Sequence, residues 1–109
     1  MADHMDKVYF KSYPTEKGMM IAMCDSELLG KTFTEGKKEI DLERYADFYK
    51  GELMTTKAAV ELAGKDVIFS ANVVGERSVN AFIKMGLVSK AEVMTIAGIP
   101  IVHLYRTLG

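Results

Sequence analysis

Hydrophobic and polar positions alternate near the start of the chain in the pattern typical of a β-hairpin. The alternation begins at Lys7, and a second apolar run covers residues 19–24. The residues between the two runs, Pro14 to Gly18, are of the types that form turns. The pattern therefore predicts two antiparallel strands at the start of the fold.

Steps of three and four residues between apolar positions predict helices farther along. Tyr45, Phe48 and Tyr49 share one face of a helical turn, and another helix begins at Thr55 or Thr56 and ends at Gly64. Before them, Asp25 is placed to cap a short helix that Gly30 ends. A turn over residues 34–37 leads into a half-buried strand over residues 39–42.

The segment after residue 67 has two readings. Residues 67–69 begin a buried strand, which either continues to Val74 before a helix opens at Glu76, or gives way to a helix over residues 73–85 that Asn72 caps. We favour the second reading, because a strand would bury the Asn72 amide on an apolar face without an evident partner.

Two more strands are predicted at the C-terminal end, over residues 92–97 and 101–106, joined by a tight connection that contains Pro100. This order of elements mixes hairpins with one or two crossovers. It predicts an α+β two-layer sandwich, in which a mixed sheet carries helices on one face.

Composition narrows the class of protein. The chain has 109 residues, of which 49% are hydrophobic and 27% are charged, and this fits one domain over residues 7–109 after a flexible terminus at residues 1–6. Its one cysteine, Cys24, can form no intramolecular disulfide, so we expect a cytoplasmic protein. A net charge of −1 creates no global attraction to nucleic acid, and the apolar run at residues 19–24 is far shorter than a membrane span.

Cys24 is the residue best suited to covalent catalysis. It precedes a predicted helix start, where a thiol pKa falls, and His103 would serve as its base in a minimal dyad. However, Asp25 opposes ionisation of the thiol, and His103 fits a half-exposed position in the last strand. We expect no metal and no cofactor, since the two histidines and the cysteine lack ligand spacing and no nucleotide signature is present.

The richest polar grouping covers residues 72–78. At a helix start, the amides around Gly75 would point outward and hold an anion, with Arg77 adding a fork for phosphate. The simpler interpretation is structural: Asn72 caps the helix, Glu76 complements its dipole, and Arg77 is solvated.

Four motifs together resemble one known family. They are residues 24–31 (CDSELLGK), 48–53 (FYKGEL), 71–77 (ANVVGER) and 98–100 (GIP). In this order they are similar to the archaeal family known as domain of unknown function 424, over residues 7 to 108. The resemblance implies an archaeal cytosolic protein with a two-layer fold and a link to the translation machinery. Ile101 stands where family members often carry a polar residue or histidine after the proline.

Our leading hypothesis is a non-enzymatic binding or accessory module, whose partner is RNA or a ribosome-associated protein. The proposed contact residues gather at three predicted helix ends: Lys31, Glu52, Asn72, Gly75, Glu76 and Arg77. The alternative is a small enzyme with Cys24 or a Glu52/Glu76 carboxylate pair at its centre. A homodimer that hides a sheet edge is a third hypothesis.

Overall fold

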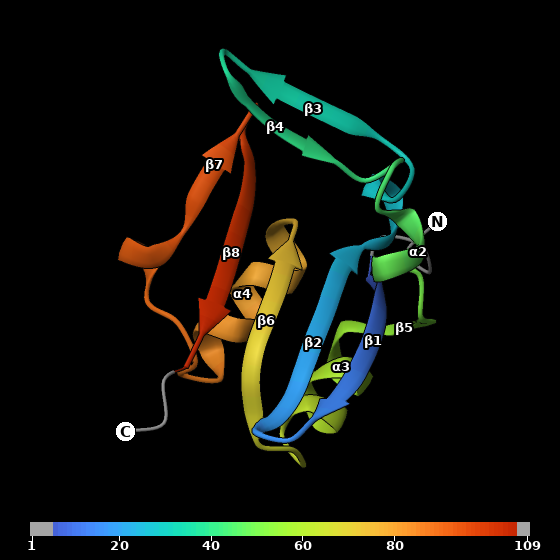
Figure 1. Cartoon of the computed structure of the whole chain (residues 1–109), viewed down its shortest axis with the longest axis vertical. Coiled ribbons are helices and arrows are strands. Elements are labelled where there is room, and N and C mark those ends of the chain that lie inside the picture. Colours follow the sequence, from blue (N-terminus) through green and yellow to red (C-terminus); the bar gives the residue numbers. More distant parts are fainter. Residues whose placement is uncertain (1–5, 107–109) are drawn as a thin grey trace.

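A mixed sheet of six strands runs through the computed structural model, which describes residues 6–106 (Figure 1). The strand order across the sheet is β5-β1-β2-β6-β8-β7. β2 and β6 run parallel, whereas antiparallel pairing joins the other neighbours. The strands are β1 (Lys7–Thr15), β2 (Gly18–Asp25), β5 (Glu52–Thr55), β6 (Ile68–Val74), β7 (Met94–Ile96) and β8 (Ile99–Tyr105).

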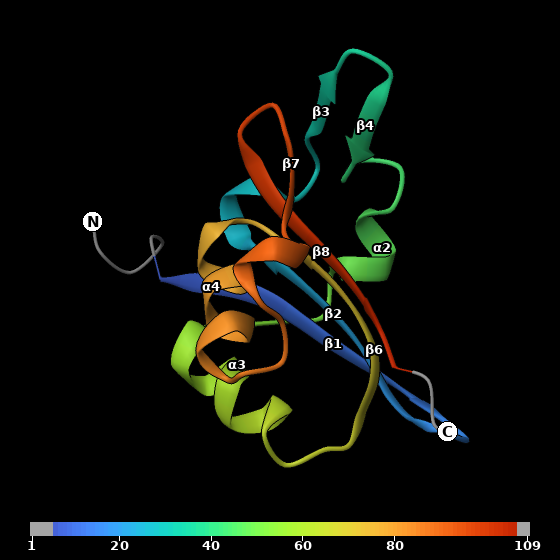
Figure 2. The ribbon, with the colours of Figure 1, turned by 90° about the vertical axis from the view of Figure 1, so that its left-hand side faces the viewer.

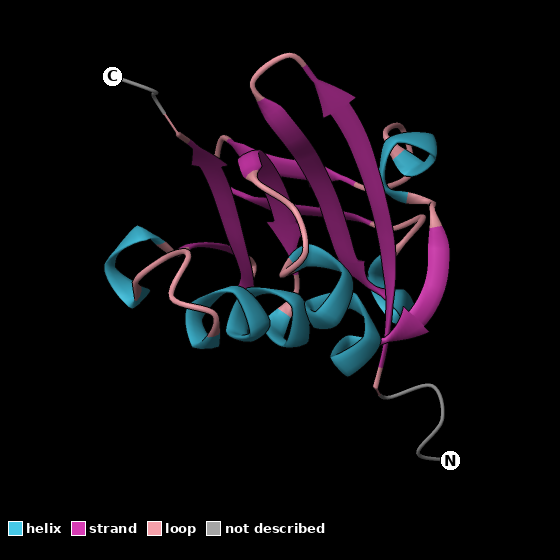
Figure 3. Cartoon of the chain, turned by 90° about the horizontal axis from the view of Figure 1, so that it is seen from below, coloured by secondary structure: helices cyan, strands magenta, loops and turns pink. Residues whose placement is uncertain are grey.

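Two helices, α3 (Thr56–Ala63) and α4 (Glu76–Lys84), lie side by side on one face of the sheet (Figures 2 and 3). The short helix α2 (Ala46–Tyr49) and a two-stranded sheet of β3 (Thr32–Glu35) and β4 (Lys38–Asp41) cover part of the opposite side. Two 3-10 turns, η1 (Ser26–Leu28) and η2 (Lys90–Glu92), complete the chain's regular elements. The predicted α+β class with a mixed sheet is confirmed, and α2 adds a partial second covering.

Alternation along the central strands divides the buried side chains into two cores. The core beneath α3 and α4 includes Val8, Ile21, Val73, Phe82 and Val102. The core on the other face includes Ala22, Cys24, Leu42, Tyr49, Val74 and Ile101. Each central strand is therefore buried on both faces at the end where α2 and the β3–β4 hairpin lie.

The preferred reading of residues 70–78 is wrong, and the alternative is correct. Asn72 lies inside β6, which extends to Val74, and α4 begins at Glu76. The argument against a strand assumed a fully buried face, but Asn72 is half-buried, on the side of the sheet away from α3 and α4. A partly uncovered sheet face tolerates the amide because water reaches it.

The first hairpin and the helix after Thr55 are confirmed, and Thr55 caps that helix by accepting a hydrogen bond from the Ala58 amide at 3.1 Å. Strands β3 and β5 were not predicted, because segments of four residues show too little periodicity. Residues 1–5 of the expected loose terminus lie outside the described residues. Asp6 was assigned to that terminus, but its backbone carbonyl accepts a hydrogen bond from the Thr56 amide at 2.9 Å.

Candidate functional site

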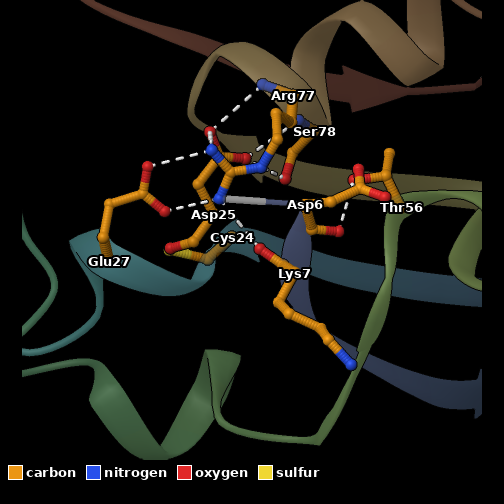
Figure 4. Close-up of polar contacts among 8 residues, drawn as sticks. All are labelled: Asp6, Lys7, Cys24, Asp25, Glu27, Thr56, Arg77 and Ser78. Atoms are coloured by element: carbon orange, nitrogen blue, oxygen red, sulfur yellow. Dashed lines mark hydrogen bonds and ion pairs between the residues drawn. The ribbon is translucent and has the colours of Figure 1, made fainter. Parts of the chain in front are cut away.

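Asp25 ends β2 and places its carboxylate at the start of α4 (Figure 4). Its Oδ1 accepts hydrogen bonds from the Ser78 amide at 2.9 Å and the Ser78 hydroxyl at 2.7 Å, and its Oδ2 accepts the Arg77 amide at 3.1 Å. The prediction that Asp25 caps the short helix following it is wrong, since η1 receives no side-chain cap. Asp25 instead pairs amides that the start of α4 would leave free.

Gly75 makes this long-range cap sterically feasible. Its φ of 108° lies in the region that favours glycine, and a Cβ there would stand 2.6 Å from Asp25 Oδ2 and 2.7 Å from Oδ1. The Gly75 amide donates to the Pro100 carbonyl at 2.9 Å, which ties the start of α4 to β8. Gly75 is thus needed for close packing around a buried carboxylate.

The Arg77 side chain closes the same cluster (Figure 4). Its Nη1 donates to Glu27 Oε2 at 3.0 Å, its Nη2 donates to the other Glu27 oxygen, and Nη2 also donates to the Lys7 carbonyl at 2.9 Å. These hydrogen bonds lower the pKa of Glu27 and raise the pKa of Arg77. The guanidinium charge is therefore balanced by Glu27 and by Asp25, 3.8 Å from Nη1.

The six predicted contact residues do not form one surface. Gly75, Glu76 and Arg77 meet at the start of α4, and exposed Lys31 lies close enough to Glu27 to help lower its pKa. In contrast, Glu52 begins the edge strand β5, and Asn72 lies on the sheet face away from α4. Binding by this set stays a prediction, and the amides meant for an anion already face the Asp25 carboxylate.

Cys24 is poorly placed to act as a nucleophile. It is fully buried, and its Sγ donates to the Asp25 carbonyl at 3.3 Å. Burial, together with the negative charges of Asp25 and Glu27, raises the pKa of Cys24 to about 12. The thiol is therefore protonated at neutral pH. His103 is exposed on β8, and the whole of β6 separates that strand from β2 and Cys24.

The Glu52/Glu76 carboxylate pair is not assembled either. Glu52 pairs with Phe10 at the β5 edge of the sheet, whereas Glu76 lines a hollow with Thr95 and Pro100 near the β7 edge. General acid and base groups must both reach the same reacting atoms. Glu52 lies on the edge strand β5, whereas Glu76 begins α4 directly after β6, and β1 and β2 stand between those two strands, so the carboxylates cannot do so.

Part of the sheet face away from α3 and α4 is uncovered, in front of β2, β6 and β8 in Figure 1. The strand register aligns two rows of side chains across β1, β2, β6 and β8 on this face: Lys11, Ala22, Asn72 and His103, then Tyr13, Met20, Ser70 and Tyr105. We call these eight residues the sheet platform. Ala22 and Ser70 within it are buried, so the other six side chains are the ones that solvent reaches. None of them is acidic, so an incoming anion meets no carboxylate within either row.

The two ends of the platform differ. At the β1 end, the Tyr13 hydroxyl donates to the Phe48 carbonyl at 2.7 Å and its ring stacks on Phe48 at 5.3 Å. The Lys11 ammonium donates to the Asp47 carbonyl at 3.1 Å. At the β8 end, Tyr105 keeps 66% of its surface exposed. The platform thus has one ring held by α2 and one ring presented to solvent.

A β-bulge places a second ring beside Tyr105. Met19 pairs with Ile68 and Met20 pairs with Ser70, so Phe69 is the extra residue between them. The Phe69 and Tyr105 ring centroids are 4.9 Å apart, and the Lys17 ammonium lies 5.4 Å from the centre of the Phe69 ring. Sequence reasoning missed Lys17, Phe69 and Tyr105, because only the pairing of β6 with β2 and with β8 brings them together. The sequence did offer one signal of an uncovered sheet face, namely the half-exposed strand position expected for His103. In the structure His103 is exposed.

Within residues 6–106, none of the helices combines the length and hydropathy that a membrane span requires. No curated protein matches the chain. A crystal structure described as that of an uncharacterized conserved protein from Methanopyrus kandleri aligns with a TM-score of 0.75 and 20% sequence identity, covering 94% of this chain and 96% of that one. At this identity, the similarity establishes the fold alone.

The family comparison extends over most of the chain. The model described as "Protein of unknown function (DUF424)" matches residues 13–107, which include all four motifs noted in the sequence and most of the fold. The resemblance expected from those motifs is therefore confirmed, and the chain belongs to the DUF424 family.

Proposed function

We propose that this protein is a non-enzymatic binding module that contacts single-stranded RNA through its sheet platform. The observation that carries the proposal is the exposed Tyr105 ring, paired with Phe69 on a sheet face whose aligned side chains include no carboxylate. Exposed rings on a sheet are suited to stacking with unpaired bases, which present π-faces in single strands.

Polar groups of the platform complement the rings. Asn72 offers an amide donor and acceptor for a base edge, and exposed His103 lies beside it in register. Lys11 adds positive charge beside the Tyr13 ring, and Lys17 adds positive charge beside the Phe69 ring. Duplex RNA stacks its bases internally, so the platform favours a single strand. An RNA partner also agrees with the cytoplasmic location expected from the lone thiol.

The alternative enzymatic function has weaker support. The Cys24 thiol is buried and protonated, and β1 and β2 separate Glu52 on β5 from β6, after which Glu76 begins α4. Binding therefore accounts for the exposed groups without requiring chemistry from groups that are buried or far apart.

Fluorescence anisotropy with labelled 12-nucleotide single-stranded RNA, measured at about 50 and 200 mM salt, tests the proposal. Base stacking on an aromatic ring contributes about 1–3 kcal/mol, so Tyr105→Ala should weaken binding by about 5- to 160-fold. Tyr45→Ala is the matched control, because Tyr45 is also an exposed tyrosine, at 53%, but directly precedes α2 and is not one of the platform residues. Binding of wild type should weaken as salt rises.

Absence of salt-sensitive binding, or equal losses in both tyrosine variants, would contradict the RNA contact. A ribosomal RNA fragment forms a second arm of the titration. Co-sedimentation with ribosomes without binding to either free RNA would instead assign the contact to a ribosomal protein and overturn the proposal.

A further inference from the structure

A hollow of about 460 Å³ is lined by Phe69, whose ring contacts Tyr105 of the platform, and by Lys17. It lies where the β1–β2 turn, the start of β6 and the end of β8 come together, at the lower end of the molecule in Figure 1. Its apolar walls include Val67, Met85 and Leu87, and its charged groups are Lys17, Asp66 and Arg106. We call this hollow the end pocket.

Backbone contacts hold the charged groups of the end pocket in place. The Met19 amide donates to the Val67 carbonyl at 2.8 Å, and a Cβ on Gly18 would stand 2.6 Å from that carbonyl oxygen. The turn that carries Lys17 is thereby fixed against the start of β6. On the other side, the Arg106 amide donates to the Phe69 carbonyl at 2.9 Å. Two segments from distant parts of the chain, each carrying a cationic side chain, are thus fixed beside one pocket.

The combination of groups matches the parts of a nucleotide. The volume falls in the range typical of small-ligand sites, and Val67 exposes 73% of its surface beside the Phe69 ring. Apolar walls suit the face of a base, whereas Lys17 and Arg106 suit a phosphate. The Asp66 carboxylate repels phosphate but accepts hydrogen bonds from a base N–H or a ribose hydroxyl. The pocket therefore distinguishes the two ends of a nucleotide.

We propose that the end pocket binds one nucleoside 5′-phosphate unit, with its base against Val67 and Leu87 and its phosphate at Lys17 and Arg106. This inference rests on the proposed function, because Phe69 and Lys17 belong to the surroundings of both the pocket and the platform. A single-stranded RNA that passes from the platform around Phe69 to the end of the sheet would place one unstacked nucleotide in the pocket. A free nucleoside monophosphate offers the same chemistry.

Proton–nitrogen NMR titration of the full chain with each of the four nucleoside 5′-monophosphates tests the pocket directly. Amide shifts should concentrate at residues 66–69, 85–87 and 106, and inorganic phosphate alone should not reproduce those at 85–87. Val67→Asp places a carboxylate on an exposed wall and should weaken nucleotide binding at least fivefold. Leu53→Asp on β5 is the matched control, since Leu53 is also an exposed apolar residue, at 46%.

The RNA titration separates this inference from the proposed function. Arg106→Gln should weaken RNA binding and reduce the slope of log affinity against log salt by about 0.7, the value for one phosphate contact on a single strand. If RNA binds through Tyr105 but mononucleotides shift no pocket amide, the pocket inference is overturned and the proposed function stands. If mononucleotides bind while RNA does not, the pocket is a site for free nucleotides and the RNA function falls.

Discussion

The start of α4 and the aromatic end of the sheet use similar residue types in opposite ways. At the start of α4, a buried carboxylate, two amides and a guanidinium are bonded to one another. At the other end, the Tyr105 ring is exposed, and the exposed Lys17 and Arg106 charges line a hollow. Polar groups that bond to one another stabilise a fold, whereas groups left toward solvent are free to bind a partner. The comparison therefore favours the aromatic end as the place of the proposed function.

We expect the largest loss of stability from a substitution at Gly75, where the backbone packs most tightly against the Asp25 carboxylate. Gly75→Ala forces a Cβ against the Asp25 carboxylate at a positive φ and should lower the free energy of unfolding by about 3 kcal/mol or more. Gly36→Ala is the control, since Gly36 has a positive φ of 62° but open space around it, and should cost about 1 kcal/mol. Urea unfolding of both variants measures the difference. Equal losses would mean that Asp25 does not need Gly75.

Removal of the carboxylate should have the next largest effect. Asp25→Ala leaves two amides and the Ser78 hydroxyl without their acceptor and should destabilise the protein by about 3 kcal/mol. Asp25→Asn keeps one acceptor oxygen and should lose less. Thermal and urea unfolding provide the measurement, and a loss below about 1 kcal/mol for the alanine variant would refute the long-range cap.

Arg77 offers the sharpest contrast with Tyr105. Arg77→Gln breaks the pair with a half-exposed Glu27, so stability should fall by about 1 kcal/mol while RNA affinity stays within about twofold of wild type. Tyr105→Ala should show the reverse, with affinity lost and stability nearly unchanged. RNA binding that depends on Arg77 as strongly as on Tyr105 would erase the distinction between the two regions.

The reactivity of the Cys24 thiol measures whether the core around it opens to solvent. A pKa of about 12 predicts that a disulfide reagent at pH 8 reacts with unfolded protein but not with native protein. Because burial favours the protonated thiol, its contribution to stability is present below the ordinary pKa of 9.0 and is lost as pH rises toward 12. Rapid labelling of Cys24 in the native protein would show that the core on the side of the sheet away from α3 and α4 is open to solvent.

The smallest effect is expected in acid. The pKa values of Glu27 and Asp41 lie below their ordinary values of 4.5 and 3.8, because hydrogen bonds from Arg77 and from the Arg44 amide favour the ionised carboxylates. The stability that these two ionised carboxylates contribute is present above their ordinary pKa values. It is lost as the pH falls through their lowered pKa values. Unfolding measured from pH 6 to pH 3 should reveal this decline, and Arg77→Gln should remove the Glu27 part of it.

Local pattern determined much of the fold. The alternation after Lys7, the Thr55 cap and the Gly64 end were sufficient to identify a hairpin and a helix, because nearest neighbours in the chain decide such elements. The same reasoning failed at Asn72, whose burial depends on whether another element covers that face of the sheet. It also failed at Asp25, whose hydrogen-bond partners lie more than 50 residues away.

By itself, the sequence determined the α+β class, the family and the absence of acidic residues at the positions that became the platform. The tertiary structure alone decided which polar groups face one another and which face water. Strand pairing joined Phe69 to Tyr105 and turned Asp25 toward α4, through contacts between segments that no local periodicity relates. The same residue types therefore form a closed structural cluster at one end and an accessible surface at the other.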